Sequence, residues 1–382
     1  MQINGRVMTV GIPALMFVSV VFSGSALADV EEDVLGRARS LHQEAFVADL
    51  HADPLIWNRD LNRRTKKGHI DFPRLREAGV DLQVCGLPTY GPPFKSAFRI
   101  VCWLQGWPRE ARKNPVARAN WMIDQLERFI EESDGSVLLV RDPDEMEYNR
   151  SMGILSTMLV IEGGQVLDGR VENLDTFFQR GVRGIGLTHF VPNDLGGGSF
   201  KKADRDRGLT DLGRKIIGHA NDLGIIVDLA HASEATVLDI LDTSRAPMMF
   251  SHTGLHAVHD HWRNISDDVV AKVAGKGGII GVIFQTGYLS DKIDGFLGGN
   301  SIDDLVDHIM HVVDLAGPEH VAYGSDFDGG INPPRGMKDV TDLPLVTAAL
   351  LERGLPEEDV RLILGGNFRR LFRQVWEARR MD

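Results

Sequence analysis

Short apolar runs that alternate with amphipathic stretches constrain the fold of this chain more than any other feature. Eight runs rich in Val, Ile and Leu predict buried strands, and helix-like stretches separate most of them. The predicted strands are 46–51, 80–87, 158–162, 182–188, 225–231, 247–252, 279–284 and 321–326. Nearly continuous apolar strands between helices indicate a parallel sheet covered on both faces. Eight such units over about 300 residues favour an α/β fold, the (β/α)8 barrel, over an open sheet.

The stretches between the strands carry the residues that begin and end helices. Apolar residues recur at helical spacing in 117–131, and Thr210 and Gly224 can begin and end a helix over 209–223. A further helix over 301–315 opens on Ser301 with a capping-box pattern, and Ser266 opens another in a similar way. Residues 89–114 are rich in Gly, Pro and aromatics, which predicts an irregular insertion near one mouth of the barrel.

The N-terminus has the pattern of a signal peptide. Arg6 precedes an apolar stretch over 7–22, and Ala26 and Ala28 supply the small residues of a cleavage site. Residues 1–28 are therefore expected to be removed, leaving 29–382 as a single barrel domain that is periplasmic or secreted; an uncleaved anchor is the alternative. The rest of the chain contains no apolar run of about 18 residues, so no membrane span is expected after cleavage.

Charge and cysteine content exclude several classes of function. With 42 Lys and Arg against 54 Asp and Glu, the net charge is -12, which argues against nucleic-acid binding. Two cysteines cannot form a disulfide scaffold or a zinc site of four thiolates. Cys85 and Cys102 either pair with each other or remain two buried thiols.

Metal-ligating residue types fall at the C-terminal ends of the predicted strands. His51 and Asp53 end the first strand two residues apart, so their side chains point to the same side. Glu162 ends the third strand, and His231 and His252 end the fifth and sixth. Each residue alone is more often structural, but all of them lie at the face where barrel enzymes build their active sites. Their agreement predicts a functional site.

The ligand types indicate which metal this site would hold. Imidazoles and carboxylates without thiolates suit Zn²⁺, with Mn²⁺, Co²⁺ or Fe²⁺ as alternatives. The set suffices for two ions that share Glu162, one with His51 and Asp53 and the other with His231 and His252. A water between two such ions loses a proton near neutral pH and becomes a nucleophile.

The eighth predicted strand ends in Asp326, a carboxylate that the two ions do not need as a ligand. A free carboxylate beside the nucleophilic water can take its proton and pass it to the leaving amine. Asp326 is therefore the predicted catalytic residue.

At these residues the sequence resembles the membrane dipeptidase family, also called renal dipeptidase, within the amidohydrolase superfamily. The resemblance extends from about residue 46 to about residue 372 and follows the order of the family's motifs. The matching motifs are Asp49-Leu50-His51-Ala52-Asp53, Ile161-Glu162-Gly163, Leu187-Thr188-His189, Val227-Asp228-Leu229-Ala230-His231, Phe250-Ser251-His252, Arg263-Asn264 and Gly324-Ser325-Asp326-Phe327-Asp328-Gly329. The resemblance implies a dipeptidase with two zinc ions bridged by Glu162.

The resemblance also implies two substrate-binding residues. His189 would contact the scissile carbonyl, and Arg263 would hold the free C-terminal carboxylate of the dipeptide. It further implies that a D-residue at the C-terminal position is accepted. The seventh strand departs from the family pattern, because Gln285 stands where an aromatic residue is common and Tyr288 follows later. This departure, like the divergent 89–114 segment, concerns specificity and not the metal chemistry.

Other functions and assemblies stay open at this point. The same site could hydrolyse another small amide, such as a β-lactam or an N-acyl amino acid. A catalytically inactive barrel that only binds a peptide or a metal is a more remote alternative, because all six positions are filled. The better-known mammalian members of the family are dimers, so a homodimer is a further possibility.

Overall fold

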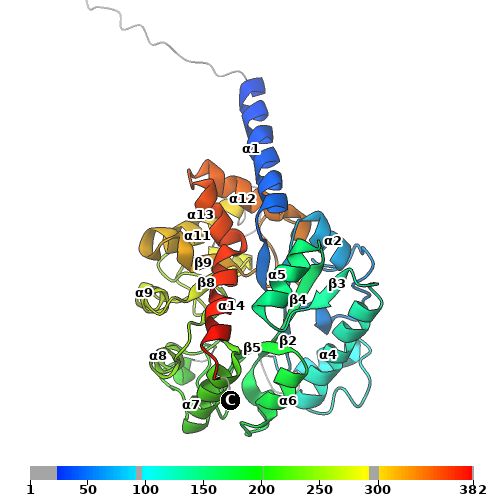
Figure 1. The fold of residues 1–382 in the computed structure, drawn as a ribbon. Helices are drawn as coiled ribbons and strands as arrows, with labels where there is room; N and C mark the ends of the chain where they lie inside the picture. Colours follow the sequence, from blue (N-terminus) through cyan, green and yellow to red (C-terminus); the bar gives the residue numbers. More distant parts are fainter. Residues whose placement is uncertain (1–23, 92–96, 201, 292–300, 381–382) are drawn as a thin grey trace, which may run out of the picture.

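A closed barrel of eight parallel strands forms the centre of the molecule (Figure 1). The computed structural model describes residues 24–91, 97–200, 202–291 and 301–380. The barrel strands are β1 (Ala48–Ala52), β2 (Leu82–Pro88), β4 (Leu155–Glu162), β5 (Val182–Gly186), β6 (Ile226–Asp228), β7 (Met249–Thr253), β8 (Ile279–Val282) and β9 (Val321–Tyr323). β1 pairs with both β2 and β9, and β2 pairs directly with β4, which closes the ring. The predicted (β/α)8 fold is confirmed, and each predicted strand overlaps one barrel strand.

Two features of the sheet differ from the prediction. A short strand, β3 (Val137–Leu139), pairs with the start of β4 outside the ring and was not predicted. Its three residues are too few to show a clear apolar pattern. Several barrel strands also end earlier than predicted, because β5, β6 and β9 stop before the polar residues that follow them.

Helices surround the barrel on the outside. They are α1 (Gly24–Glu44), α2 (Phe72–Glu77), α3 (Ala97–Leu104), α4 (Pro115–Glu131), α5 (Pro143–Ser151), α6 (Asn173–Gln179), α7 (Asp211–Leu223), α8 (Glu234–Thr243), α9 (Asp267–Gly275), α10 (Thr286–Leu289), α11 (Ile302–Ala316), α12 (Leu343–Glu352), α13 (Glu357–Arg361) and α14 (Asn367–Glu377). Thr210 caps α7 through a bond from the Gly213 N–H, and Gly224 ends it with a φ of 75°. Ser301 opens α11 with the predicted capping box.

The prediction that 89–114 is irregular throughout was wrong, because α3 occupies residues 97–104. The Gly and Pro residues that suggested a loop lie outside this helix, at 91–93 and 106–108. The predicted signal segment 1–28 lies mostly outside the described residues. Within the described residues, no helix has the length and apolar character needed to cross a bilayer.

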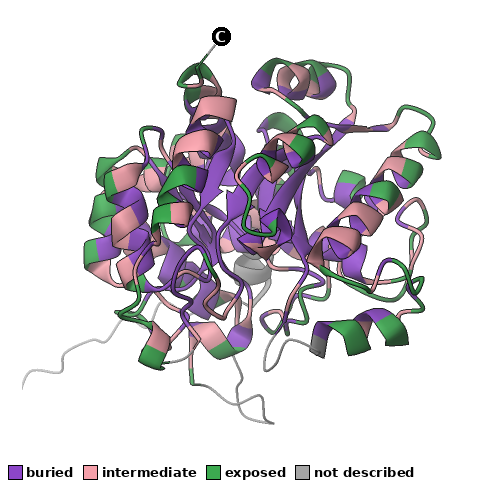
Figure 2. Cartoon of the chain, turned by 90° about the horizontal axis from the view of Figure 1, so that it is seen from below, coloured by how far each residue is buried: buried purple, intermediate pink, exposed green. Residues whose placement is uncertain are grey.

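The interior of the barrel is apolar at one end and polar at the other. Leu50, Val84 and Met158 fill it together with Phe368 and Phe372 of α14. Figure 2 shows the central strands buried and the surrounding helices exposed on their outer sides. α14 packs against the starts of the strands, so the carboxyl ends of the strands are left for the polar residues.

Candidate metal centre

Glu162 is the point at which the predicted ligands meet. It is the last residue of β4, and its side chain is buried. Its Oε1 lies 2.9 Å from Nε2 of His231 and 3.7 Å from Nε2 of both His51 and His252. These histidines come from β1, from β7 and from the turn after β6, so the centre is assembled only when the ring of strands closes.

Both predicted ligand groups lie around this carboxylate. His51 Nε2 is 3.7 Å from Asp53 Oδ1, and ligand atoms of His51, Asp53 and Glu162 lie within 4.8 Å of one another. In the other group, His231 Nε2 and His252 Nε2 are 2.9 Å apart. The structure therefore places each of the two predicted sets of three side chains around a common point.

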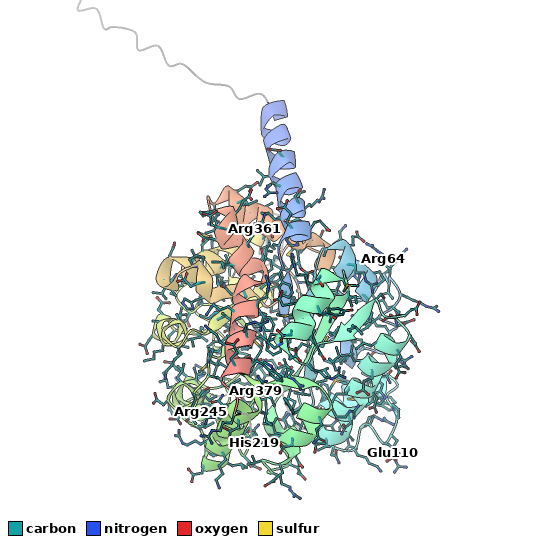
Figure 3. All side chains as sticks on the ribbon, viewed as in Figure 1. Arg64, Glu110, His219, Arg245, Arg361 and Arg379 are labelled. Atoms are coloured by element: carbon teal, nitrogen blue, oxygen red, sulfur yellow. The ribbon has the colours of Figure 1, made fainter. Side chains whose placement is uncertain are left out.

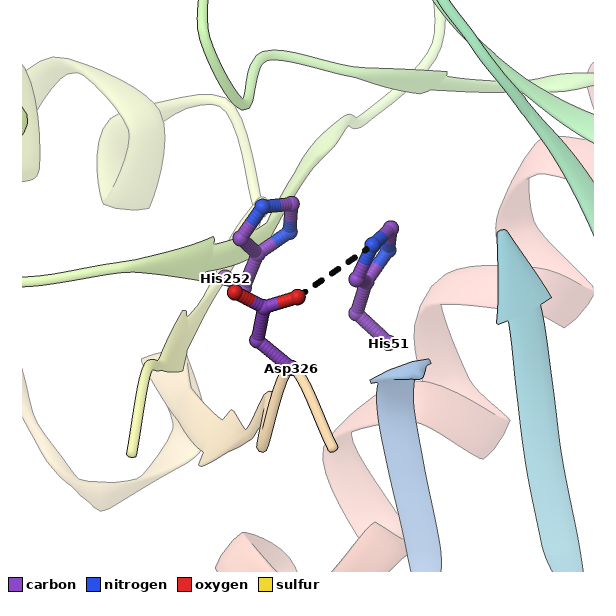
Figure 4. A group of neighbouring side chains, drawn as sticks. All are labelled: His51, His252 and Asp326. Carbon is purple, nitrogen blue, oxygen red and sulfur yellow. Dashed lines mark ion pairs between the residues drawn. The ribbon is translucent and has the colours of Figure 1, made fainter. Parts of the chain in front are cut away.

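Asp326 lies beside both groups. Its Oδ1 is 3.9 Å from His51 Nε2, and Figure 4 shows it between His51 and His252. The rings of these two histidines stack with their centroids 3.9 Å apart. Ligand atoms of His51, His252 and Asp326 also lie within 4.8 Å of one another. The geometry therefore allows Asp326 to contact either a metal or a water at the centre.

The two predicted substrate-binding residues border the same centre. His189 Nε2 is 3.5 Å from Glu162 Oε1, and its Nδ1 is hydrogen-bonded to the carbonyl of Tyr90. Arg263 is only 3% exposed, and it donates from Nη2 to the carbonyl of His252 at 2.8 Å. Its Nε has no hydrogen-bond partner among the described residues. His189 therefore lies within the cluster, and Arg263 is held against the backbone of His252 beside it.

Gln285 faces a neighbouring loop. Its Oε1 accepts a hydrogen bond from the N–H of Asn332 at 2.8 Å. Tyr288 stacks on the ring of His261 with the centroids 4.5 Å apart, and its backbone carbonyl accepts from Asn264. The contact of Gln285 assigns it to the wall of the mouth. The phenol of Tyr288, in contrast, lies within electrostatic reach of Arg263 and Asp326: burial raises the pKa of this phenol, Arg263 lowers it and Asp326 raises it.

Unpartnered buried atoms show that the cluster fits a divalent cation. Within the described residues, buried atoms without a hydrogen-bond partner include both ring nitrogens of His51, Oδ1 of Asp53 and Oε2 of Glu162. Leaving such atoms unsatisfied is costly, and three buried carboxylates close together repel one another. Cations bound by these atoms would offset both costs. An imidazole and carboxylate set of this kind suits zinc and related transition metals.

Burial also shifts the protonation of these groups. It lowers the pKa of His51 and His189 to about 3 and that of His231 and His252 well below the ordinary value. The histidines are therefore neutral, which is the form that binds metals. Burial raises the pKa of Glu162 well above its ordinary value, and the nearby carboxylates raise it further. A bound cation would favour the ionised carboxylates and so reverse this shift.

Backbone strain is concentrated at the same centre. His231 and Asp326 have φ values of 65° and 60°, and Phe190, next to His189, has a φ of 60°. The left-handed region is unfavourable for residues with a side chain, and it persists only where the surroundings hold it. The Phe190 ring lies 4.2 Å from the ring of His231, centroid to centroid. These bends aim the side chains into the barrel mouth directly after the strands end.

A buried network that the sequence analysis missed supports the ligands. Asp49 accepts hydrogen bonds from the Ser325 N–H at 2.8 Å, from the Ser325 hydroxyl at 2.6 Å and from Gln83 at 3.1 Å. These bonds join β1 to the turn after β9, and so fix His51 relative to Asp326. An Asp two residues before a predicted ligand, on the same side of an apolar strand, was the available signal.

A second support holds His252. Asp228, at the end of β6, accepts a hydrogen bond from the Ser251 N–H at 2.9 Å. Ser251 Oγ in turn lies 2.8 Å from His252 Nδ1. Such outer contacts orient a ligating imidazole and determine which nitrogen carries its proton. The two cysteines take no part in the cluster: Cys85 and Cys102 are both buried free thiols.

Comparison with known proteins agrees with this arrangement. Residues 35–381 match the membrane dipeptidase family, peptidase family M19. An uncharacterized dipeptidase of Schizosaccharomyces pombe is 29% identical over 361 residues, which cover 91% of this chain and 85% of that protein. Dipeptidase aclJ of Aspergillus oryzae is 30% identical over 310 residues, which cover 81% of this chain and 70% of that protein.

A solved structure is similar over most of its length. It is a metallopeptidase from Rhodobacter sphaeroides, liganded with a phosphinate mimic of the dipeptide L-Ala-D-Ala, and it is 25% identical with a TM-score of 0.73. The match covers 87% of this chain and 99% of that one. Given the barrel, its metal-ligand cluster and the match over nearly the whole described chain, this protein belongs to the membrane dipeptidase family, peptidase family M19, and is a metallo-dipeptidase.

Proposed function

We propose that the chain hydrolyses free dipeptides at a centre of two divalent cations, with zinc as the preferred metal. The observation that carries this proposal is the position of Glu162, whose Oε1 lies 2.9–3.7 Å from the Nε2 atoms of the three predicted ligand histidines. A carboxylate at the junction of two ligand groups can bridge two ions. Such ions would supply Lewis acidity and an activated water.

Asp326 moves the proton in this proposal. Burial raises its pKa to about 7, although Arg263 opposes the shift. Cations bound at the centre would lower this pKa, so Asp326 would be ionised and able to accept a proton from the attacking water, as general acid–base catalysis requires. Asp326 therefore takes a proton from the attacking water and delivers it to the leaving amine.

His189 contacts the reacting carbonyl. Its Nδ1 faces the Tyr90 carbonyl, so in the neutral ring Nδ1 carries the proton and Nε2 is free. Nε2 can then donate to an oxyanion only after the ring takes up a second proton. The low pKa of His189 opposes that step until negative charge develops on the substrate.

Arg263 selects dipeptides by their free carboxylate. A buried guanidinium with an unpartnered Nε can hold a carboxylate through charge-assisted hydrogen bonds. In a longer peptide, an uncharged amide would occupy this position and leave the guanidinium unpaired. We further propose that a D-residue is accepted at the C-terminal position. The L-Ala-D-Ala mimic bound by the related Rhodobacter sphaeroides enzyme supports this extension.

A substrate panel tests the proposal. Rates are measured on L,L and L,D dipeptides, on the same dipeptides amidated at the C-terminus or acetylated at the N-terminus, and on N-acyl amino acids and β-lactams. Free dipeptides should react fastest, and amidation should raise KM. Equal rates on free and amidated substrates would contradict the role of Arg263, and activity on N-acyl amino acids or β-lactams alone would favour the broader amidohydrolase function.

The variant Arg263→Lys provides a matched control for the panel. Lysine keeps the charge but loses the fork that holds a carboxylate with two bonds. The variant should therefore raise KM for free dipeptides while leaving the rate on amidated ones nearly unchanged.

We also propose that residues 1–28 direct export and that the barrel works in the periplasm or outside the cell. The apolar stretch and the Ala26-x-Ala28 pattern support this location. N-terminal sequencing of the exported protein should find Asp29 first, whereas a protein that keeps Met1 in the cytoplasm would contradict export.

A further inference from the structure

We propose that α3 and the segment after it form a docking surface for membranes that contain anionic phospholipid. The inference is independent of the peptidase activity, because none of its residues belongs to the metal centre. This surface, the α3 patch, consists of Arg99, Ile100, Trp103, Leu104, Arg109, Arg112 and Lys113.

The apolar part of the α3 patch is the outer face of a helix that is apolar on both sides. Phe98 and Cys102 face inward and are buried. Ile100, Trp103 and Leu104 face outward and are 51%, 63% and 67% exposed. Their spacing places them side by side on one helix face. They are three of the seven strongly exposed large apolar side chains among the described residues, so the cluster is not a scatter of single residues.

The inner side of the segment is fixed to the barrel, so the outer face cannot turn inward. Trp107 stacks on Trp121 with ring centroids 4.0 Å apart, and its indole N–H donates to the carbonyl of Ile56 at 3.0 Å. Phe98 packs against the same indole edge-on. Figure 3 places Glu110, just after α3, at the end of the molecule away from α1.

The charge of the α3 patch is opposite to that of the whole chain. Residues 97–114 carry four cations and a single carboxylate, Glu110, whereas the chain has a net charge of -12. The cations and two of the apolar residues line a hollow of about 620 Å³. Such a hollow suits a phosphate headgroup, and the adjacent Ile100, Trp103 and Leu104 suit acyl chains. Cationic side chains around an apolar, Trp-containing helix face are typical of helices that lie in an anionic membrane interface.

Charge and size favour a membrane over a second copy of the chain. A symmetric dimer through this patch would bring the same cations of both copies together, and like charges across an interface are unfavourable. Three partly exposed apolar side chains also cover only part of the about 800 Å² that each partner contributes to a standard protein interface. A lipid surface is fluid, so binding to it does not require a groove of complementary shape.

Vesicle co-sedimentation of the exported protein, which is expected to begin at Asp29, tests the proposal. Vesicles of equimolar phosphatidylglycerol and phosphatidylcholine should bind it, and binding should weaken as salt increases, because the cations contribute. Trp103→Ser with Leu104→Ser should weaken binding at least about tenfold, because apolar groups that would enter the lipid are removed. Arg99→Glu with Arg109→Glu should abolish the preference for anionic over pure phosphatidylcholine vesicles.

The matched control is Tyr148→Ser with Met152→Ser. These side chains are 58% and 59% exposed at the end of α5, but the preceding residues are acidic and include Asp144 and Glu145. This variant should bind like the wild type. All proteins in the series begin at Asp29, so the apolar segment at 7–22 makes no contribution to vesicle binding. Dipeptide hydrolysis should be unchanged in solution for every variant, which shows that each one folds.

Two outcomes would overturn the proposal. One is equal vesicle binding by the wild type and the Trp103→Ser, Leu104→Ser variant. The other is a wild-type dimer, measured by light scattering, that this variant abolishes while neither protein binds vesicles. The second result would make the α3 patch an interface between copies of the chain.

Discussion

His231 and Asp326 show how single residues create the site after their strands have ended. Both have left-handed backbones, with φ of 65° and 60°. A left-handed backbone directs the side chain away from the strand axis, so the side chain can extend across the mouth of the barrel. The cost is roughly 1–2 kcal/mol per residue. Contacts at the centre, such as the bond from the Asp326 N–H to the carbonyl of His51 at 2.9 Å, help to offset it.

Asp326→Asn tests the proton-transfer role of this carboxylate. Asparagine keeps the shape but cannot accept a proton, so kcat on a dipeptide should fall by about 10²–10⁴-fold. The metal content, measured by elemental analysis, should stay the same as in the wild type. Loss of metal in this variant would instead identify Asp326 as a ligand, and unchanged kcat would exclude it as the proton carrier.

The gathering of the site's polar residues at the strand ends could be predicted from sequence, but their supporting contacts could not. His51, Glu162 and His252 follow apolar runs, where a polar residue stands out. The bonds from Ser325 to Asp49 join residues that are 276 positions apart, so they depend on the register between strands. The bond between His189 and the Tyr90 carbonyl likewise depends on the position of a loop.

At the scale of elements, apolar pattern located the strands but not their ends. The predicted strand 321–326 is a strand only over Val321–Tyr323. Polar residues whose side chains turn into the barrel mouth no longer pair with the neighbouring strand, so the strand ends before them. Residue composition does not show where this happens. α3 was missed for a different reason: its neighbours are rich in Gly and Pro, and its own residues are apolar on both faces.

Glycines allow neighbouring strands to approach closely near the mouth of the barrel. A Cβ added to Gly324, just after β9, would lie 1.9 Å from the carbonyl oxygen of Ser251. The Ser251 carbonyl oxygen belongs to the backbone, so no side-chain rotation can relieve this clash. Gly324→Ala should therefore lower the free energy of unfolding by about 3 kcal/mol, which urea denaturation measures.

Gly218→Ala is the matched control for this substitution. Gly218 lies inside α7, and an added Cβ would meet no atom within 4 Å. Alanine is the better helix former, so this variant should be more stable by about 0.5–1 kcal/mol. If both variants lost stability equally, the close approach at Ser251 would not be the cause.

At the scale of the whole molecule, buried histidines connect stability to pH. His42 of α1 lies between the carbonyl of Ala78 and the hydroxyl of Thr347, and burial lowers its pKa to about 4. Burial likewise lowers the pKa of His308 to about 4. The unfolded chain takes up these protons near pH 6.5, before the folded chain does, so acid favours unfolding.

The expected result is a loss of stability as the pH falls from about 6.5 to about 4, on the order of 3 kcal/mol for each buried histidine. Urea denaturation across this range measures it. His42→Gln, which can still donate to the Ala78 carbonyl but cannot be protonated, should show a shallower dependence on pH. An identical dependence in the variant would remove His42 from the explanation.

Metal stoichiometry distinguishes a shared two-metal centre from a site for a single ion. The protein is stripped with a chelator, Zn²⁺ is added back in known equivalents, and hydrolysis of a free dipeptide is measured at each step. The stripped protein should be inactive, and its activity should rise until about two ions are bound per chain, because Glu162 lies between two ligand groups. Full activity in the stripped protein, or a plateau at a single bound ion, would rule out a shared two-metal centre.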